Sequence, residues 1–314
     1  MNEVRLLSVT ERERLALKRV EECESLPVLP VVVSTLLAMD EDNPYGSDHA
    51  LSIARIDPCF AVRVIALAQR AHGGDVQGTL PLGQSIRALG KDGLVTPLLE
   101  HSKILVFAPT DDAQKHLWLH ALQVAALSEQ LAYFLSNEID GELAYFAGLI
   151  HDLGRFVAYF KESDLPIHIE SHGLLTPEDL TDSESSKNAV SHTLVGATAA
   201  EVWGLPKELR EVIGNHHRLN NSLEQPSPTS MLIAVVRFAD TISHQLMSGV
   251  EPESEAFQNK TSEYLRFDSL FTADVEALTE RVIRLSRRCL DESFISFHKL
   301  EIGETNYTKH KISS

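Results

Sequence analysis

Apolar residues recur three and four positions apart along most of this chain of 314 residues, and no other sequence feature restricts the fold as strongly. This spacing places apolar side chains on one face of an α-helix, where they can pack against a neighbouring helix. Strands would need short β-branched runs that alternate with polar residues, and such runs are scarce. The sequence therefore predicts an all-α protein.

Proline and glycine predict where several helices begin and end. A helix over residues 58–72 starts at Pro58, which suits a first helical turn, and ends at Gly73-Gly74. Gly204 should end one helix and Pro206 should begin the next. We interpret 176–187 as a mobile connection or a short surface helix, and 220–230 as a loop. Further helices are expected over residues 80–90, Leu117–Leu135 and Met231 to about Leu290, the last with an interruption near Glu251–Glu253.

Composition and charge exclude several classes of protein. With 43% apolar and 23% charged residues, the chain resembles a soluble globular protein with one large domain or two ordinary ones. No apolar run is long enough to cross a bilayer or to form a signal peptide, so we expect a cytoplasmic protein that does not bind membranes. Three isolated cysteines, Cys23, Cys59 and Cys289, indicate neither a disulfide framework nor a thiolate metal site.

The formal charge of −17 argues against general nucleic-acid binding, because a negative field repels phosphate. One candidate basic patch is formed by four arginines that share a helical face, and we interpret it as a solvated surface. These arginines are Arg281, Arg284, Arg287 and Arg288.

Five histidines stand where helix packing would normally place apolar residues, and two aspartates accompany them. His120, for example, shares a helical face with Val124, Leu127 and Leu131. The set is His120, His151, Asp152, His192, His216, His217 and Asp240. A single buried histidine is usually a core residue with backbone partners, and an aspartate at a helix end is usually a cap.

The joint occurrence of these seven residues favours a metal site over seven separate polar residues. Burying each group alone would cost desolvation free energy, whereas one or two cations could satisfy the whole set. Imidazole and carboxylate ligands without thiolate suit Fe, Mn, Ni, Zn or Co, and the residues do not choose among these ions. Periodicity alone does not bring the seven residues together in space.

Several linked motifs resemble the HDOD family, a branch of the HD superfamily. The resemblance covers roughly residues 22–218 and is specific as a set. The order of the seven ligands also resembles that of the HD-GYP branch, whose members are metal-dependent phosphohydrolases. The motifs are LPVLPVVVSTLLAM at 26–39, IARIDPCFAVRVIALAQRAHGG at 53–74, TLPLGQSIRALG at 79–90, FAGLIHDLGR at 146–155, SHTLVGATAAEVWGLP at 191–206 and VIGNHH at 212–217.

The resemblance implies a helical HDOD fold of two packed lobes, the second an HD-like helical bundle. We expect an N-terminal helical extension over 1–21 and an HDOD domain over 22–219. Within the domain, 22–110 would form the N-terminal lobe and 111–219 the HD-like lobe. The C-terminal helical segment, 220–314, should pack on the HD-like lobe, because Asp240 must reach the site. Its apolar residues Phe257, Leu265, Phe267, Leu270 and Phe271 should either fold onto the body or form a homodimer contact.

The resemblance also implies which residues hold metal. His120, His151, Asp152 and Asp240 would hold one ion, and Asp152, His192, His216 and His217 the second. Two departures bear on catalysis: no GYP motif follows His217, and Arg155 stands where many HD-GYP enzymes have lysine. Asp152 and Arg155 are the candidate catalytic residues, and arginine cannot donate a proton near neutral pH.

Two functions from different classes follow from this pattern. The first is a bacterial signalling module that keeps a metal site, binds signalling proteins through the surface between its lobes, and does not catalyse. The alternative is a metal-dependent phosphohydrolase or phosphodiesterase acting on a nucleotide or another phosphorylated small molecule. Metal reconstitution followed by a phosphoester panel separates the two.

Overall fold

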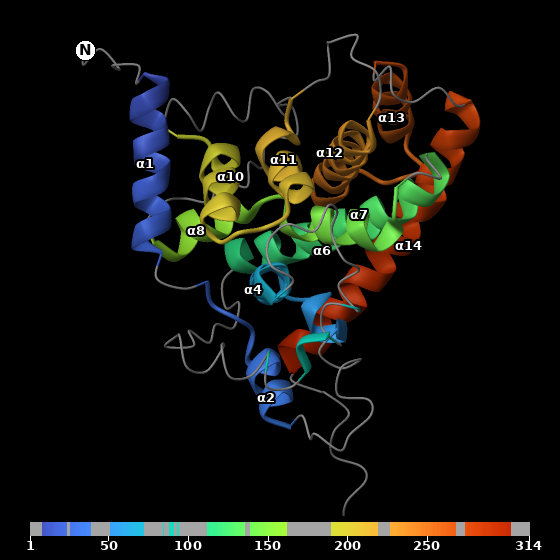
Figure 1. The fold of residues 1–314 in the computed structure, drawn as a ribbon. Coiled ribbons are helices and arrows are strands. Elements are labelled where there is room, and N and C mark those ends of the chain that lie inside the picture. Colours follow the sequence, from blue (N-terminus) through green and yellow to red (C-terminus); the bar gives the residue numbers. More distant parts are fainter. Residues whose placement is uncertain are drawn as a thin grey trace, which may run out of the picture.

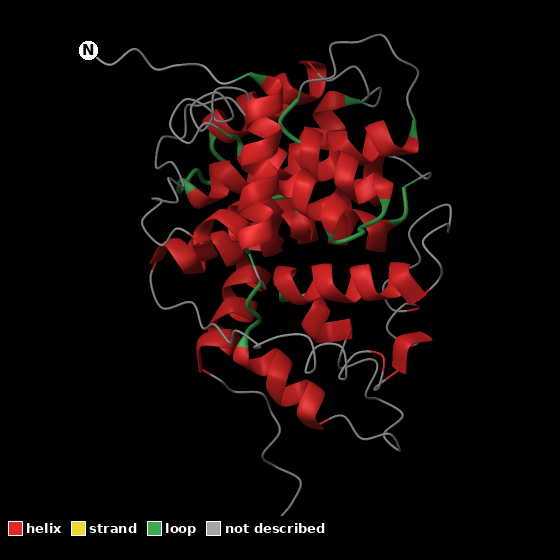
Figure 2. Ribbon diagram, turned by 60° about the vertical axis from the view of Figure 1, so that its left-hand side comes forward, coloured by secondary structure: helices red, strands yellow, loops and turns green. Residues whose placement is uncertain are grey.

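Helices make up the regular structure in the computed structural model, and no strand occurs among the residues that it describes. The protein is all-α and two-lobed, as predicted, with a larger upper group of helices and a smaller lower group (Figure 2). The described residues are 8–23, 26–38, 51–71, 84, 88–90, 93, 112–135, 139–161, 190–218, 227–267 and 274–302. Gly73, Gly74, most of 80–90 and all of 176–187 lie outside these ranges.

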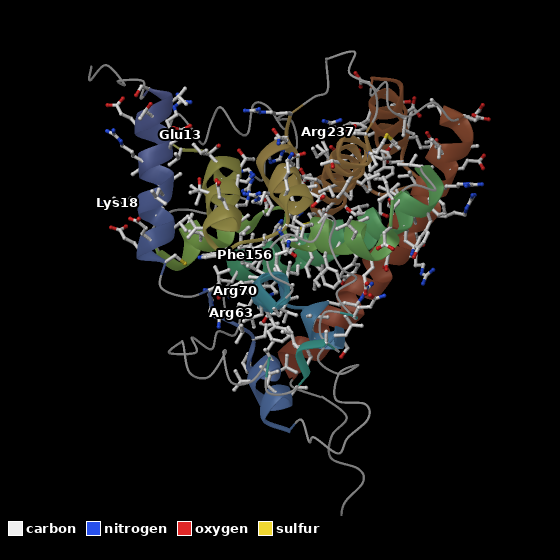
Figure 3. The ribbon with its side chains drawn as sticks, in the orientation of Figure 1. Glu13, Lys18, Arg63, Arg70, Phe156 and Arg237 are labelled. Carbon is white, nitrogen blue, oxygen red and sulfur yellow. The ribbon has the colours of Figure 1, made fainter. Side chains whose placement is uncertain are left out.

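The HD-like lobe is built around α6 (Asp112–Leu135), which crosses the middle of the molecule (Figure 1). It packs against α7 (Gly141–Ile150) and α12 (Pro228–Met247). On the other side of the lobe, α8 (Leu153–Lys161) packs against α10 (His192–Val202), which packs against α11 (Lys207–Asn215). Phe156 of α8 (Figure 3) meets Trp118 of α6 edge to face, with ring centroids 4.9 Å apart. This contact ties the two halves of the lobe together.

Capping side chains fix where the helices of this lobe begin. Asp140 accepts a hydrogen bond from the Leu143 amide at the start of α7, and Ser191 caps α10 through the Leu194 amide. Ser227 forms a capping box with Ser230, so α12 begins at Pro228, inside the stretch expected to be a loop. Gly204 ends α10 with a φ of +76°, as its position predicted.

The N-terminal lobe contains α2 (Pro30–Ala38) and α4 (Pro58–Ala71), which begins at the proline predicted to start it. Asp57 joins the two helices, because its carboxylate accepts hydrogen bonds from the amides of Leu29 and Phe60. Burial, opposed by those amide donors, raises the pKa of Asp57 to about 6. Arg63 and Arg70 both extend from α4 (Figure 3).

The first and last helices both pack on the HD-like lobe. The N-terminal helix α1 (Val9–Glu22) lies against α10 and α8. After α12, helix α13 (Glu255–Phe267) packs on α14 (Val275–Ile302), and α14 runs along α6. Phe257 and Leu265 are buried within the chain; the side chain of Phe267 and residues 270–271 lie outside what the structure describes. None of the helices in the described ranges combines the length and apolar character needed to cross a membrane.

Candidate metal centre

The seven predicted ligands come from five places in the HD-like lobe, and the fold brings all of them into one buried cluster. His120 lies in the middle of α6, and Asp240 in the middle of α12. The others stand at helix ends: His151 and Asp152 after α7, His192 at the start of α10, and His216 and His217 after α11. Each of the seven is at most 6% exposed.

Two glycines allow the helix ends to meet. A Cβ atom on Gly154 would lie 1.9 Å from the His192 carbonyl oxygen, and one on Gly196 would lie 2.8 Å from the Gly154 nitrogen. Helices α8 and α10 therefore touch backbone to backbone at this point. That contact brings His192 to the carboxylate of Asp152, with 3.2 Å between His192 Nε2 and Asp152 Oδ1.

Asp152 lies at the centre of the cluster, with one carboxylate oxygen facing each half. Its Oδ1 atom lies 3.2 Å from His192 Nε2 and 3.7 Å from His216 Nε2. Its Oδ2 atom lies 3.7 Å from His120 Nε2 and 3.6 Å from His151 Nε2. A carboxylate in this position can bridge two cations.

Backbone carbonyls determine which ring nitrogen of two histidines faces the cluster. His151 Nδ1 lies 2.7 Å from the Gly148 carbonyl oxygen, and His216 Nδ1 lies 3.0 Å from that of Ile213. A carbonyl oxygen only accepts hydrogen bonds, so each Nδ1 carries the proton. In the neutral rings, each Nε2 then presents its lone pair to the cluster, which is the arrangement that a metal ligand needs.

A serine and a glutamine orient His120 in the same way. Ser243 donates a hydrogen bond to Gln123 Oε1 at 2.9 Å, so its hydroxyl oxygen is left to accept from His120 Nδ1 at 3.0 Å. The Nε2 lone pair of His120 is thereby directed at Asp240, whose Oδ1 lies 3.1 Å away. Both of these atoms are hydrogen-bond acceptors in the neutral ring form.

The cluster also brings imidazole nitrogens from different helices close together. The Nε2 atom of His192 lies 3.1 Å from that of His217 and 3.4 Å from that of His216. Among the seven ligands, the buried atoms without a hydrogen-bond partner are His120 Nε2, His151 Nε2, Asp152 Oδ1, His217 Nδ1 and both carboxylate oxygens of Asp240. Each such atom costs about 1–3 kcal/mol unless something satisfies it. Divalent cations fit this donor set, because they would satisfy the nitrogens and the carboxylates together.

The pKa values favour the forms that bind metal. Burial lowers the pKa of His151 to about 3 and lowers the pKa values of His120 and His217, which keeps these rings neutral. Burial raises the pKa of Asp152, but the Arg155 guanidinium and the neighbouring imidazoles outweigh it and hold that pKa well below its ordinary value. The pKa of Asp240 is also well below its ordinary value, because His244 and His120 outweigh burial.

Three overlapping groups have ligand atoms within 4.8 Å of one another. One is Asp152, His192, His216 and His217, which is the second set implied by the resemblance. The other two share His120: His120, His151 and Asp152, and His120, Asp240 and His244. His244 is not among the ligands predicted from the sequence. The signal was present, because His244 stands four residues after Asp240 and therefore on the same face of α12.

Arg155, the second candidate catalytic residue, lies beside the cluster. Its side chain is 9% exposed, and its Nε atom lies 3.0 Å from Asp152 Oδ2. One nitrogen of the guanidinium thus faces the carboxylate that lies between both halves of the cluster. When two ions are bound, such a centre supplies Lewis acids that can stabilise charge on a phosphoryl oxygen.

The fold and the cluster define a helical protein of the HD type, with a buried histidine–aspartate centre compatible with a divalent metal. The sequence model of the HDOD domain family matches residues 26–219 of this chain. Since this match covers more than half of the chain, the protein belongs to the HDOD domain family.

Similar proteins show how far this assignment extends. An uncharacterized protein of Treponema pallidum (strain Nichols) is 23% identical over 288 residues, which are 91% of this chain and 53% of that protein. Ribonuclease Y of Mycoplasma genitalium (strain ATCC 33530 / DSM 19775 / NCTC 10195 / G37) is 30% identical over 98 residues, or 31% of this chain and 14% of the ribonuclease. The chain thus spans about half of the first relative and a small part of the second.

Two solved structures share the fold. The MmoQ response regulator of Methylococcus capsulatus str. Bath superposes with a TM-score of 0.57 and 17% identity, covering 82% of this chain and 99% of its own. A virulence factor of Campylobacter jejuni subsp. jejuni gives a TM-score of 0.58 and 17% identity, covering 90% and 99%. At this identity the likeness concerns the fold alone.

Proposed function

We propose that this protein is a regulatory HDOD protein that binds one or two divalent metal ions in the buried cluster and does not turn over a phosphoester. The observation that carries the metal proposal is the set of buried nitrogen and oxygen atoms without partners, which face one another around Asp152. The metal is Fe, Mn, Ni, Zn or Co, because imidazole and carboxylate are the ligands offered. A regulatory role agrees with membership of the HDOD family and with the name of the MmoQ response regulator.

Burial of the cluster supports the non-catalytic half of the proposal. A phosphoester must reach the ions, yet every one of the seven ligands is at most 6% exposed. Arg155, the nearest candidate for holding a phosphate, is paired with Asp152 at 3.0 Å. The ions would therefore stabilise the HD-like lobe, and a partner would recognise its outer surface.

The surface between the lobes is the proposed docking site for signalling proteins. The two lobes meet where Arg55 pairs with Glu129 of α6 at 2.8 Å, and both side chains remain partly exposed there. A partner that binds across this boundary would respond to the relative position of the two lobes. Homodimerisation stays a prediction as well. Nucleic acid is a poor candidate partner, because Arg287 pairs with Glu251 and Glu253, and Arg284 with Glu280.

The alternative function is a metal-dependent phosphohydrolase or phosphodiesterase, with a nucleotide or another phosphorylated small molecule as substrate. Its support is the position of Asp152, which offers one oxygen to each ligand group, as a dinuclear hydrolytic centre requires. The partial match to ribonuclease Y points to the same chemistry.

The deciding experiment measures phosphoester turnover by protein loaded with Fe, Mn, Ni, Zn or Co, with the ion content determined in the same samples. The proposal predicts filled ion positions and no turnover of cyclic dinucleotides, nucleotides or generic phosphomonoesters and phosphodiesters. Turnover that is lost in Asp152→Ala would contradict it and establish the enzyme. Arg284→Ala, at an exposed position on α14, is the matched control for the substitution itself, because it should change neither the ion content nor any turnover by the chain.

A further inference from the structure

His244 is the one member of the three ligand groups that reaches solvent. Its side chain is 40% exposed, whereas the other seven residues of the groups are at most 6% exposed. It lies one helical turn beyond Asp240 on α12, outside the residues that match the HDOD model. The cluster is therefore accessible to solvent on the side where His244 lies.

His244 forms a compact triad with two of the buried ligands. Its Nε2 atom lies 3.2 Å from Asp240 Oδ1, and His120 Nε2 lies 3.1 Å from the same oxygen. The rings of His120 and His244 have centroids 4.7 Å apart and are tilted by 42°. Two imidazole nitrogens and one carboxylate oxygen are a ligand set that a divalent transition-metal ion accepts.

His120 belongs to both this triad and the inner group with His151 and Asp152. Its Nδ1 is held by Ser243, so a single lone pair, on Nε2, is left to bind metal. One lone pair binds one ion at a time. An ion bound by both His120 and His244 must therefore dissociate from His244, or change position, when His120 binds an ion in the inner group.

We propose that His120, Asp240 and His244 form an outer cation position through which a divalent transition-metal ion enters the centre. The ion first binds at the solvent edge, and then moves inward as His151 and Asp152 replace His244 while His120 stays bound. This inference rests on the proposed metal binding of the inner cluster. His244 lies outside the seven predicted ligands and acts in loading, not in the final coordination of the ion.

Loading kinetics test the outer position. Protein stripped of metal is mixed rapidly with Zn²⁺ or Co²⁺, and the uptake rate and final ion content are measured for wild type, His244→Ala and His244→Gln. Glutamine can still hydrogen-bond Asp240 but offers no imidazole. Both variants should load about tenfold or more slowly, because one of three ligands is missing, while the final ion content stays unchanged. Thr241→Ala, on another face of the same helix, is the matched control and should load at the wild-type rate.

The outcomes separate this inference from the metal proposal itself. Wild-type loading rates in both His244 variants would overturn the outer position while leaving the inner site intact. A final content lower by one ion per chain would also overturn it, because His244 would then hold a permanent ion. Wild-type protein that takes up no metal at all would instead overturn the proposed metal binding.

Discussion

At the scale of single residues, hydrogen bonds at the Nδ1 atoms of three histidines determine that the cluster can bind a cation. The Nδ1 atoms of His120, His151 and His216 are held by Ser243 and by two backbone carbonyls, so their Nε2 lone pairs meet around two carboxylates. The sequence predicted which imidazoles and carboxylates take part. It did not predict Ser243, because a serine on a helix has no distinguishing pattern until its partner helix is placed.

The stability of metal-free protein should fall as the pH falls below the ordinary histidine range. Burial lowers the pKa of His151 from 6.5 to about 3, so between these values the unfolded chain binds more protons than the folded one. The free energy of unfolding then decreases as the pH falls through this window. His120 and His217 act in the same direction, and His244, whose pKa is raised by Asp240 against the effect of desolvation, acts against them.

Urea unfolding in the presence of a chelator measures this effect. His151→Gln removes one titrating ring, so the variant should lose about 2 kcal/mol less than wild type between about pH 7 and about pH 5. The comparison is made within each protein across pH, and the overall cost of the substitution therefore cancels. An equal loss in both proteins would show that His151 is not the neutral, buried ring described here.

At the scale of elements, helix ends and one close helix contact assemble the cluster. Four helices end or begin at a ligand, and Gly154 and Gly196 let α8 and α10 approach until backbone meets backbone. Helix type was predictable, and so were the boundaries at Pro58 and Gly204, because proline and glycine act locally. The convergence of the helices on one cluster was not predictable, because it depends on which helix faces pack against each other. The resemblance to HDOD domains supplied that part of the prediction.

Gly154→Ala should disrupt the centre, because its new Cβ atom would collide with the His192 backbone. We expect a loss of about 3 kcal/mol or more in the free energy of unfolding, together with loss of metal from the His192 side of the cluster. Gly214→Ala on α11 is the matched control. Its Cβ would meet only the Ala197 Cβ at 3.3 Å, and it should stay close to wild-type stability. Equal thermal midpoints and ion contents for the two variants would argue against the close contact.

At the scale of the whole molecule, polar contacts around Arg55 add to the apolar core that the two lobes share. The Arg55 guanidinium lies 3.6 Å above the Tyr145 ring and pairs with Glu129, while the Tyr145 hydroxyl donates to the Arg55 carbonyl at 2.6 Å. These contacts link the segment before α4 to α6 and α7. Sequence periodicity predicted helices in both lobes, but single arginines carry no pattern that identifies them as contacts between lobes.

Arg55→Met should weaken the contact between the lobes, because it removes both the ion pair and the cation–π contact, a loss of about 1–2 kcal/mol. Trp118 and Trp203, the two tryptophans of the chain, both lie in the HD-like lobe, so their fluorescence reports its unfolding. In the variant, the fluorescence transition in urea should separate from the circular dichroism transition of the whole chain. Arg70→Met, which removes only a bond to Ala66 within α4, is the control. Coincident transitions in both variants would refute this role of Arg55.

The buried cluster is proposed to bind metal, and elemental analysis of the purified protein measures that metal. Protein prepared without chelators should carry at least one Fe, Mn, Ni, Zn or Co ion per chain, and both Asp152→Ala and His216→Ala should carry less. Thr241→Ala should match wild type, because its side chain bonds only within α12. Wild-type protein that holds only trace metal, even after incubation with each ion, would contradict the claim and leave the cluster a set of buried polar residues.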